Sequence, residues 1–287
     1  MIKADGIKYT AERIWSAYRN RMAPERGKMI TSTSNAKIKN MINLKNSARA
    51  RKKQNCFLVE GPRMFFEIPE ERLAEVYLTE EFEKKYQEKL KGYSYEKISE
   101  SVCRHLSDTR TPQGVIALVR KQETTLKQLL DKEKNPCFFL LETLQDPGNM
   151  GTIIRTSEGA GVTGIIMNSA CVDPYNPKVI RSTMGAVFRV PFVLVDDFQE
   201  TLQALRKAGV TTYAAHLGGT PFYKENYKTG TAFFIGNEGN GLSEELTRKA
   251  DRKICIPMKG QVESLNAAVA STVLMYETLR QREWADC

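Results

Sequence analysis

The chain has 287 residues and a net charge of +9, with 41% hydrophobic and 27% charged residues. This composition is typical of a globular protein and excludes disordered and collagen-like chains. The apolar runs are too short for a transmembrane helix, and the N-terminus lacks the basic-then-apolar pattern of an export signal. Six cysteines without a C-x-x-C pair and only two histidines indicate free thiols in a reducing, cytoplasmic setting and no metal site.

The excess positive charge is concentrated in one segment. Between Arg26 and Val59 nine basic residues occur and no acidic one, whereas residues 60–100 contain eleven Glu against seven Lys or Arg. A one-sided stripe of this kind suits a polyanion better than an evenly basic surface does. We therefore expect this segment to contact nucleic acid, and a solvated charged face is the alternative.

The first third of the chain is predicted to fold as one compact unit, residues 29–119. Residues 1–28 are expected to be an N-terminal extension with no part in catalysis, and Met29 to be an alternative start. The first helix of the unit is expected to be capped by Ser34 and to bury four apolar positions, Ile38, Met41, Ile42 and Leu44.

Strand patterns in this unit begin at Cys56, Val76 and Val115, and a helix is predicted to start at Pro62. Strands that alternate with helices indicate the α/β class. Residues 120–135 are polar apart from a few leucines, so we expect a linker there, with a helix as the alternative.

Residues 136–287 are predicted to form the second unit, in which helical stretches separate most of the strands. A mostly parallel sheet covered on both faces explains strands that are apolar throughout. The buried strands are expected at Cys137–Leu141, Gly164–Met167, Phe188–Leu194, Thr212–Ala215 and Ala232–Ile235.

The first segment of chemical interest follows the strand that ends near Leu141. A Pro147-Gly148 turn precedes Asn149, which is expected to cap a helix that carries Arg155. A helix N-terminus placed after a strand is a ready anion site. The alternative is an ordinary capped helix with a surface arginine.

A G-x-G-x-x-G pattern at residues 159–164 imitates a dinucleotide fingerprint. In such a fingerprint the glycines follow a strand and open a helix. Here they follow a helix and open the strand at Ile165, so we interpret them as a helix C-cap and a turn. This context excludes a nicotinamide-dependent oxidoreductase.

Two further loops follow predicted strands. Residues 236–241 contain three glycines, which let a ligand approach the backbone, and Glu238 lies among them; a plain turn is the alternative. Ser264 is expected to cap a long helix, with Asn266 beside it. Its buried stripe is predicted to comprise Leu265, Val269, Thr272, Val273, Tyr276 and Leu279. In open α/β sheets, ligands bind where strands end at this edge.

Taken together, three ordered motifs resemble those of the SpoU/TrmH branch of the SPOUT RNA methyltransferases. They are Asn149-x-Gly-x-x-x-Arg155, Ile235-Gly-Asn-Glu-Gly-x-Gly-Leu242 and Ile256-Pro-Met-x-Gly-x-x-Glu-Ser-Leu-Asn266. The intervening segment around Gly185 and Arg189 also resembles that family. The Phe-Leu-Val-Glu-Gly and Pro-Gln-Gly marks of residues 29–119 are similar to an L30e-like RNA-binding domain that many members carry.

The resemblance implies a deep trefoil knot, a homodimer with an active site built across its subunits, and S-adenosylmethionine as methyl donor. Backbone atoms of Gly236, Ile256 and Leu265 would hold the cofactor, together with Gly241, Met258 and Gly260. The polar residues of the site would be Asn149, Arg155, Glu238, Ser264 and Asn266. The basic stripe would contact RNA through Lys37, Lys39, Arg51, Lys52 and Lys53.

The expected reaction is in-line transfer of a methyl group to a ribose 2′-hydroxyl of ribosomal RNA of the 23S type. Because a free guanidinium has a pKa above about 12, we expect Arg155 to clamp a phosphate or a developing alkoxide rather than act as a base. Methylation of tRNA is one alternative. A non-catalytic RNA-binding or ribosome-assembly protein that keeps the fold is another.

Overall fold

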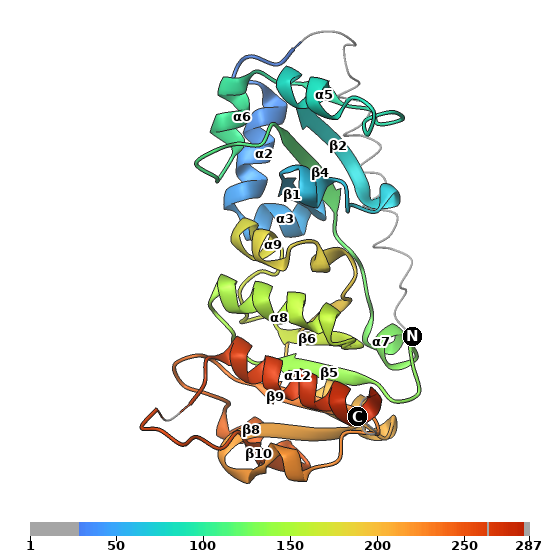
Figure 1. The fold of residues 1–287 in the computed structure, drawn as a ribbon, viewed down its shortest axis with the longest axis vertical. Helices are drawn as coiled ribbons and strands as arrows, with labels where there is room; N and C mark the ends of the chain where they lie inside the picture. Colours follow the sequence, from blue (N-terminus) through green and yellow to red (C-terminus); the bar gives the residue numbers. More distant parts are fainter. Residues whose placement is uncertain (1–28, 263, 284–287) are drawn as a thin grey trace. The chain divides into compact units, whose positions relative to one another are not determined.

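The computed structural model describes residues 29–262 and 264–283, so the predicted N-terminal extension lies outside the described residues. The described residues form two compact units. The first ends at Lys121 and also contains Tyr175–Pro177; the second comprises Gln122–Pro174 and the residues from Lys178 onward. Helices and strands of both units are labelled in Figure 1.

The first unit is a small α/β domain. Its four-stranded sheet has the order β1-β4-β2-β3, with β4 antiparallel to β1 and β2, and β3 parallel to β2. The predicted strands at Cys56 and Val115 and the helix at Pro62 are confirmed, whereas the strand predicted from Val76 begins earlier, at Leu73. Its elements are α2 (Ala36–Asn46), α3 (Ala48–Gln54), β1 (Cys56–Glu60), α4 (Pro62–Phe65), η1 (Glu70–Arg72), β2 (Leu73–Leu78), α5 (Glu80–Tyr86), β3 (Glu96–Lys97), α6 (Glu100–Leu106) and β4 (Val115–Arg120).

Helix α2 covers one face of this sheet, where Ile38 and Met41 pack with Tyr77 of β2. The helix is where it was predicted, but its cap is Asn35 and not Ser34. The side-chain oxygen of Asn35 accepts the amide N–H of Lys37 at 2.9 Å. The hydroxyl of Ser34 instead hydrogen-bonds that of Ser32, because it lies one residue too far from the free amides of the first turn.

Two of the five basic residues predicted to bind RNA instead bind acceptor groups within the protein. Arg51 is only 3% exposed, and its guanidinium donates to the carbonyls of Leu44 and Lys45 at the end of α2. Lys37 is half-buried and forms an ion pair with Glu96 of β3. Neither cation is presented to a phosphate in this structure. The other three, Lys39, Lys52 and Lys53, are exposed.

We predict that Arg51→Met lowers the free energy of unfolding by about 1–3 kcal/mol, because it leaves the buried carbonyl of Leu44 and the part-buried carbonyl of Lys45 without this donor while keeping the aliphatic stem. Urea unfolding measures this loss. Arg49→Met is the matched control, since Arg49 is exposed on the same helix and its loss should stay within about 0.5 kcal/mol. Equal effects of the two variants would contradict a structural role for Arg51.

The second unit contains a six-stranded sheet of order β10-β8-β9-β5-β6-β7 in which every neighbouring pair is parallel. The predicted α/β class with a mostly parallel sheet is confirmed. The elements beyond Lys121 are α7 (Leu126–Leu130), β5 (Cys137–Leu141), α8 (Pro147–Gly159), β6 (Gly164–Asn168), α9 (Pro177–Thr183), η2 (Ala186–Phe188), β7 (Phe192–Val195), α10 (Gln199–Lys207), β8 (Thr211–Pro221), η3 (Phe222–Lys224), β9 (Thr231–Ile235), α11 (Glu244–Lys249), β10 (Arg252–Cys255) and α12 (Ala267–Glu283).

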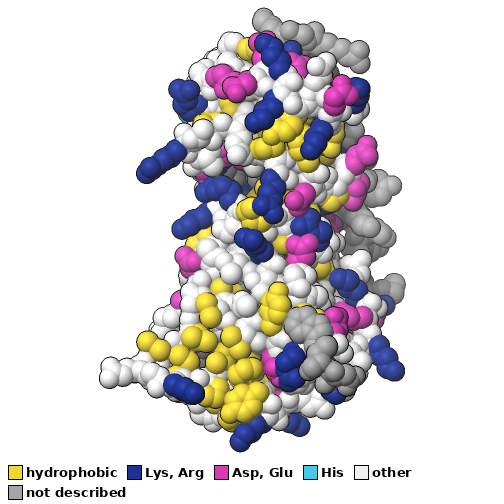
Figure 2. Space-filling model, viewed as in Figure 1, with side chains coloured by type: hydrophobic (Ala, Val, Ile, Leu, Met, Phe, Trp, Pro, Cys, Tyr) yellow, Lys and Arg dark blue, Asp and Glu magenta, His cyan; other side chains and the backbone are white. Residues whose placement is uncertain are grey.

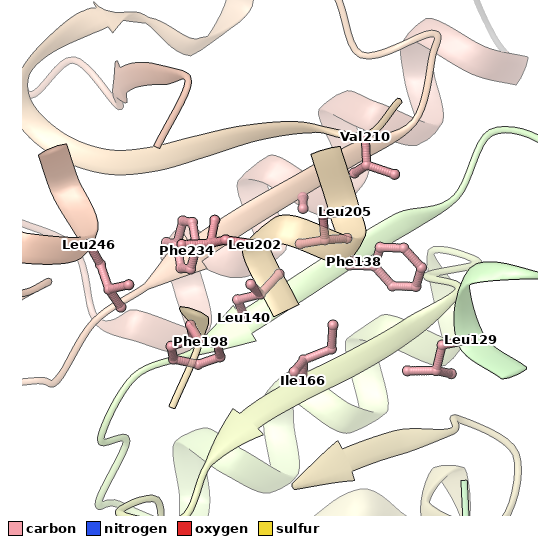
Figure 3. Packing of buried hydrophobic residues seen from close by; sticks show 11 residues of the cluster. Leu129, Phe138, Leu140, Ile166, Phe198, Leu202, Leu205, Val210, Phe234 and Leu246 are labelled. Carbon is pink, nitrogen blue, oxygen red and sulfur yellow. The ribbon is translucent and has the colours of Figure 1, made fainter. Parts of the chain in front are cut away.

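Two predicted boundaries shift in this unit. The strand expected from Phe188 begins at Phe192, because residues 186–188 form a 3₁₀ turn. The segment expected as a linker contributes α7, and Leu129 of this helix is buried in the core beside Phe138 and Ile166 (Figure 3). Leu202 and Leu205 of α10 pack into the same cluster.

Helices α8 and α12 pack against each other and lie in front of the sheet in Figure 1. Met275 of α12 accepts a hydrogen bond from the Ser157 hydroxyl of α8. The buried residues of α12 are Ala267, Ala268, Ser271, Leu274, Met275, Thr278 and Gln281. The predicted buried stripe is therefore wrong. Val269 is 48% and Tyr276 41% exposed, because the helix turns a different face, the one with Ser271 and Met275, toward the interior. Figure 2 shows hydrophobic side chains gathered on this face of the second unit.

The C-terminal end of α12 is fixed beside the amino ends of the central strands of the sheet. The guanidinium of Arg282 donates to the backbone carbonyls of Asn135, Pro136, Tyr227 and Thr229. These residues precede β5 and β9 in the chain. The helix is thus anchored where the central strands begin.

The glycines of residues 159–164 behave as predicted. Helix α8 ends at Gly159, Gly161 has a φ of +66° and β6 begins at Gly164. In the described part of the chain, no helix is both long and apolar enough to cross a membrane, no group of three metal-ligating side chains occurs, and five cysteines are free thiols.

Candidate active site

The chain leaves β5 toward β6 on one side and leaves β9 toward β10 on the other, although β5 and β9 are neighbours. This is a topological switch point, where open parallel sheets bind ligands at the carboxyl ends of their strands. A cavity of about 660 Å³ opens at the carboxyl end of β9. Its lining comes from the middle of β8, the loop after β9, the end of β10 with the segment that follows, and the start of α12.

Five of the six residues predicted to hold the cofactor line this cavity: Gly236, Gly241, Ile256, Met258 and Leu265. Gly260 is outside the lining. Of the predicted polar residues, Glu238, Ser264 and Asn266 line it. Asn149 reaches the site through hydrogen bonds, and Arg155 lies on the exposed side of α8.

The loop after β9 is held closed by Asn237. Its side-chain oxygen accepts the amides of Gly239 and Asn240 at 2.8 and 3.1 Å, and its backbone exchanges two hydrogen bonds with Gly241. Gly236 has no room for a side chain, because a Cβ there would lie 2.1 Å from the backbone nitrogen of Leu242. The loop therefore closes so tightly on itself that residue 236 must lack a side chain.

Glu238 connects this loop to the one after β5. Its carboxylate accepts the amide N–H groups of Gln145 and Asp146 at 3.2 and 3.0 Å and the side-chain amide of Asn149 at 3.0 Å. Burial alone would raise the pKa of Glu238, but the hydrogen bonds from Asn149 and the backbone outweigh it and lower the pKa below its ordinary value. The carboxylate is thus ionised at neutral pH.

Asn149 links Glu238 to the third motif. Its side-chain oxygen accepts the amide of Asn266 at 2.9 Å, while its own amide donates to Glu238. One chain of side-chain hydrogen bonds therefore joins α8, the β9 loop and the start of α12. The three motifs recognised separately in the sequence meet at this point.

Both predicted helix caps at the site are wrong by a few residues. Helix α8 is capped by Asp146, which accepts the Asn149 amide N–H at 2.8 Å, and Pro147 occupies the first turn. Helix α12 begins at Ala267 and is capped by Asn266, not Ser264. Capping by Asp146 leaves the Asn149 side chain available for Glu238 and Asn266.

The sequence did not indicate the wall supplied by β8. Residues 213–214 pair with Arg252 and Lys253, and residues 220–221 pair with Ile254 and Cys255, so residues 215–219 bulge out of the ladder. Ala215, His216 and Leu217 of this bulge line the cavity. Bulges are common beside binding sites. The Gly218-Gly219 pair directly after an apolar strand was the available signal.

Two family models match the chain. The SpoU rRNA Methylase family covers residues 136–276, and the MRM3-like substrate binding domain covers residues 35–117. The 23S rRNA (guanosine(2553)-2′-O)-methyltransferase RlmP of Bacillus subtilis is 31% identical over 87% of this chain and 98% of its own length. The chain belongs to the SpoU rRNA methylase family.

Solved structures of SpoU methyltransferases share the architecture of both units. The SpoU methyltransferase AviRb of Streptomyces viridochromogenes in complex with S-adenosylmethionine is 28% identical, with a TM-score of 0.77 over 86% of this chain and 98% of that one. An S-adenosylmethionine-bound rRNA methyltransferase of Sinorhizobium meliloti is 27% identical, with a TM-score of 0.77 over 88% and 97% of the two chains. The resemblance stated from the three motifs is confirmed.

We predict that Gly236→Ala weakens binding of S-adenosylmethionine by at least about tenfold, because the added Cβ would overlap the backbone of Gly241 and Leu242. Isothermal titration calorimetry measures this. The matched control is Gly239→Ala in the same loop, where the nearest atom to a Cβ is 3.5 Å away. Binding that is unchanged in Gly236→Ala would show that the loop does not form the cofactor site.

Proposed function

We propose that this SpoU-family protein transfers a methyl group from S-adenosylmethionine to a ribose 2′-hydroxyl of ribosomal RNA of the 23S type. The hydrogen-bonded chain from Glu238 through Asn149 to Asn266, at the rim of the cavity, is the observation that carries this proposal. The named activity of the Bacillus subtilis relative supports the choice of substrate.

The cavity suits the proposed cofactor. Glycine backbone and the apolar side chains Ile256, Met258 and Leu265 supply surface for an adenosyl group. Glu238 is the one Asp, Glu, Lys or Arg among the described lining residues. A single carboxylate complements the net positive charge of S-adenosylmethionine, which supplies an electrophilic methyl group when bound.

The protein's own residues have two tasks in this reaction. They must orient the attacking oxygen in line with the methyl group, and they must support the charge that develops as its proton leaves. Asn149, Asn266 and Ser264 offer neutral hydrogen-bonding groups at the rim. Arg155 is exposed and has no hydrogen bond or ion pair with any described residue, so its guanidinium is available to RNA.

We predict that Arg155→Lys lowers kcat by about tenfold or more while binding of S-adenosylmethionine is unchanged. Lysine keeps the charge but loses the two-pronged geometry that grips a phosphate or a developing alkoxide. Single-turnover methyl transfer measures the effect. Full activity in Arg155→Lys would rule out the two-pronged contact.

The first unit is proposed to bind RNA through Lys39, Lys52 and Lys53, which are exposed lysines in the described part of its basic stripe. Phosphate contacts of this kind add affinity without reading sequence, and they make affinity depend on salt. The match to a substrate-binding domain over residues 35–117 supports this role.

Replacing these three lysines with Gln is predicted to weaken RNA binding and to reduce the slope of log K against log salt by about 2–3. Cofactor affinity should not change. Filter binding over a salt series measures the slope. The matched control makes the same charge change at exposed lysines of the second unit, Lys134, Lys207 and Lys228. An equal loss in both triple variants would contradict a dedicated RNA surface.

We further propose a homodimer that forms through the exposed apolar face of α12, around Val269 and Tyr276. Exposed apolar positions on a helix that is otherwise packed are typical of a self-complementary interface. The double variant Val269→Lys/Tyr276→Lys should be monomeric by sedimentation, and Leu194→Lys, at another exposed apolar site, should not change the mass. The deep knot and the cytoplasmic location stay predictions.

The decisive experiment supplies methyl-labelled S-adenosylmethionine with ribosomal RNA, assembling ribosomal particles and tRNA from cells that lack the gene. Label on a ribose 2′-oxygen of ribosomal RNA, mapped by nuclease digestion, is the expected result. Label only in tRNA would keep the chemistry and replace the substrate. Cofactor binding without label in any of the three would indicate a non-catalytic RNA-binding protein.

A further inference from the structure

The loop after β5 turns through a strained residue. Thr143 has a φ of +55°, a left-handed conformation that a β-branched residue rarely adopts and that persists only where its surroundings hold it. The chain leaves the strand at this corner. Beyond it, the amides of Gln145 and Asp146 face the carboxylate of Glu238.

Two carboxamides from the neighbouring strands hold the corner. Asn168 is the last residue of β6. Its side-chain oxygen accepts the backbone N–H of Thr143 at 2.9 Å, and its side-chain amide donates to the Thr143 hydroxyl at 3.3 Å. Asn237, directly after β9, donates to the carbonyl of Thr143 at 2.9 Å. Every polar group of Thr143 is therefore satisfied, from β6 on one side of β5 and from β9 on the other.

The next two residues are tied to the same side as Asn168. The carbonyl of Leu144 accepts the amide of Val172, and the side chain of Gln145 donates to the carbonyl of Ala170. The loop after β6 thus holds the loop after β5 from one side, while Glu238 contacts it from the other side. Neither Thr143 nor Asn168 lines the cavity.

We propose that Asn168 is a positioning residue for methyl transfer that acts through the strained corner at Thr143. Holding Thr143 left-handed aims the amides of Gln145 and Asp146 at Glu238, and Glu238 in turn orients Asn149. Without Asn168 the corner relaxes toward negative φ and the two amides turn away. This inference rests on the proposed methyl transfer, which it deepens.

The test is a rescue. Asn168→Ala should lower kcat by about 10- to 100-fold, the scale expected when a catalytic array is misplaced by about an ångström. Binding of S-adenosylmethionine should change far less than kcat, because neither Thr143 nor Asn168 lines the cavity. Thr143→Gly adopts a positive φ without strain, so it should be near wild type alone. The double variant Asn168→Ala/Thr143→Gly should recover most of the lost kcat.

Three outcomes would overturn the inference: wild-type kcat in Asn168→Ala, no recovery in the double variant, or an equal loss in a matched control. That control is Asn226→Ala, which also loses a carboxamide bond to a backbone amide in this unit but lies outside the cavity lining. Urea unfolding of each variant separates loss of stability from loss of rate.

Amide hydrogen exchange tests the positioning without any assay of activity. In the full-length protein, the amides of Gln145 and Asp146 should exchange faster in Asn168→Ala and regain protection in the double variant. If wild type transfers no methyl group to any RNA, the proposed function fails while exchange still decides the positioning. If wild type is active and exchange is unaffected by Asn168→Ala, the inference alone fails.

Discussion

The site depends on one carboxylate that accepts hydrogen bonds from a different loop. Glu238 lies after β9, yet its partners are two successive amides and the Asn149 side chain that follow β5. Hydrogen bonds to an ionised acceptor are about twice as strong as neutral ones. The bonds to Glu238 therefore hold the loop after β9 firmly against the loop after β5. Asn266 extends it to α12. The cavity wall, the start of α8 and the start of α12 therefore stand in fixed relation.

The two units use charge in different ways. In the first unit, some cations of the basic stripe stabilise the fold and others are exposed to solvent. Arg51 donates to a carbonyl at the end of α2, while Lys52 and Lys53 beside it are exposed. In the second unit, the cavity is built largely from backbone and apolar side chains. Counting basic residues therefore overstates the RNA surface. Burial decides which of them can reach a phosphate.

The sequence predicted the sheet of the second unit well, because strands buried on both faces are apolar runs that stand out, such as Cys137–Leu141 and Thr231–Ile235. It predicted the face of α12 wrongly. Hydrophobicity selects Val269 and Tyr276, whereas the buried face of the helix carries Ala267 and Ser271. Side-chain partners were also out of reach: the bond from Asn149 to Glu238 spans 89 positions, and nothing local in the sequence marks Asn168 as the support of Thr143.

Helix α12 extends from the carboxyl ends of the central strands to their amino ends. Asn266 ties its first turn to Asn149 at the carboxyl ends of the strands, and Arg282 ties its last turn to four carbonyls at their beginnings. A helix of this length extends about 25 Å. Fraying from the C-terminus would first release the carbonyls before β5 and β9 and then loosen the wall of the cofactor cavity. The cofactor cavity and the stability of the C-terminus are therefore linked through a single helix. Ligand bound at the first turn of α12 should slow amide hydrogen exchange around Arg282 at its last turn.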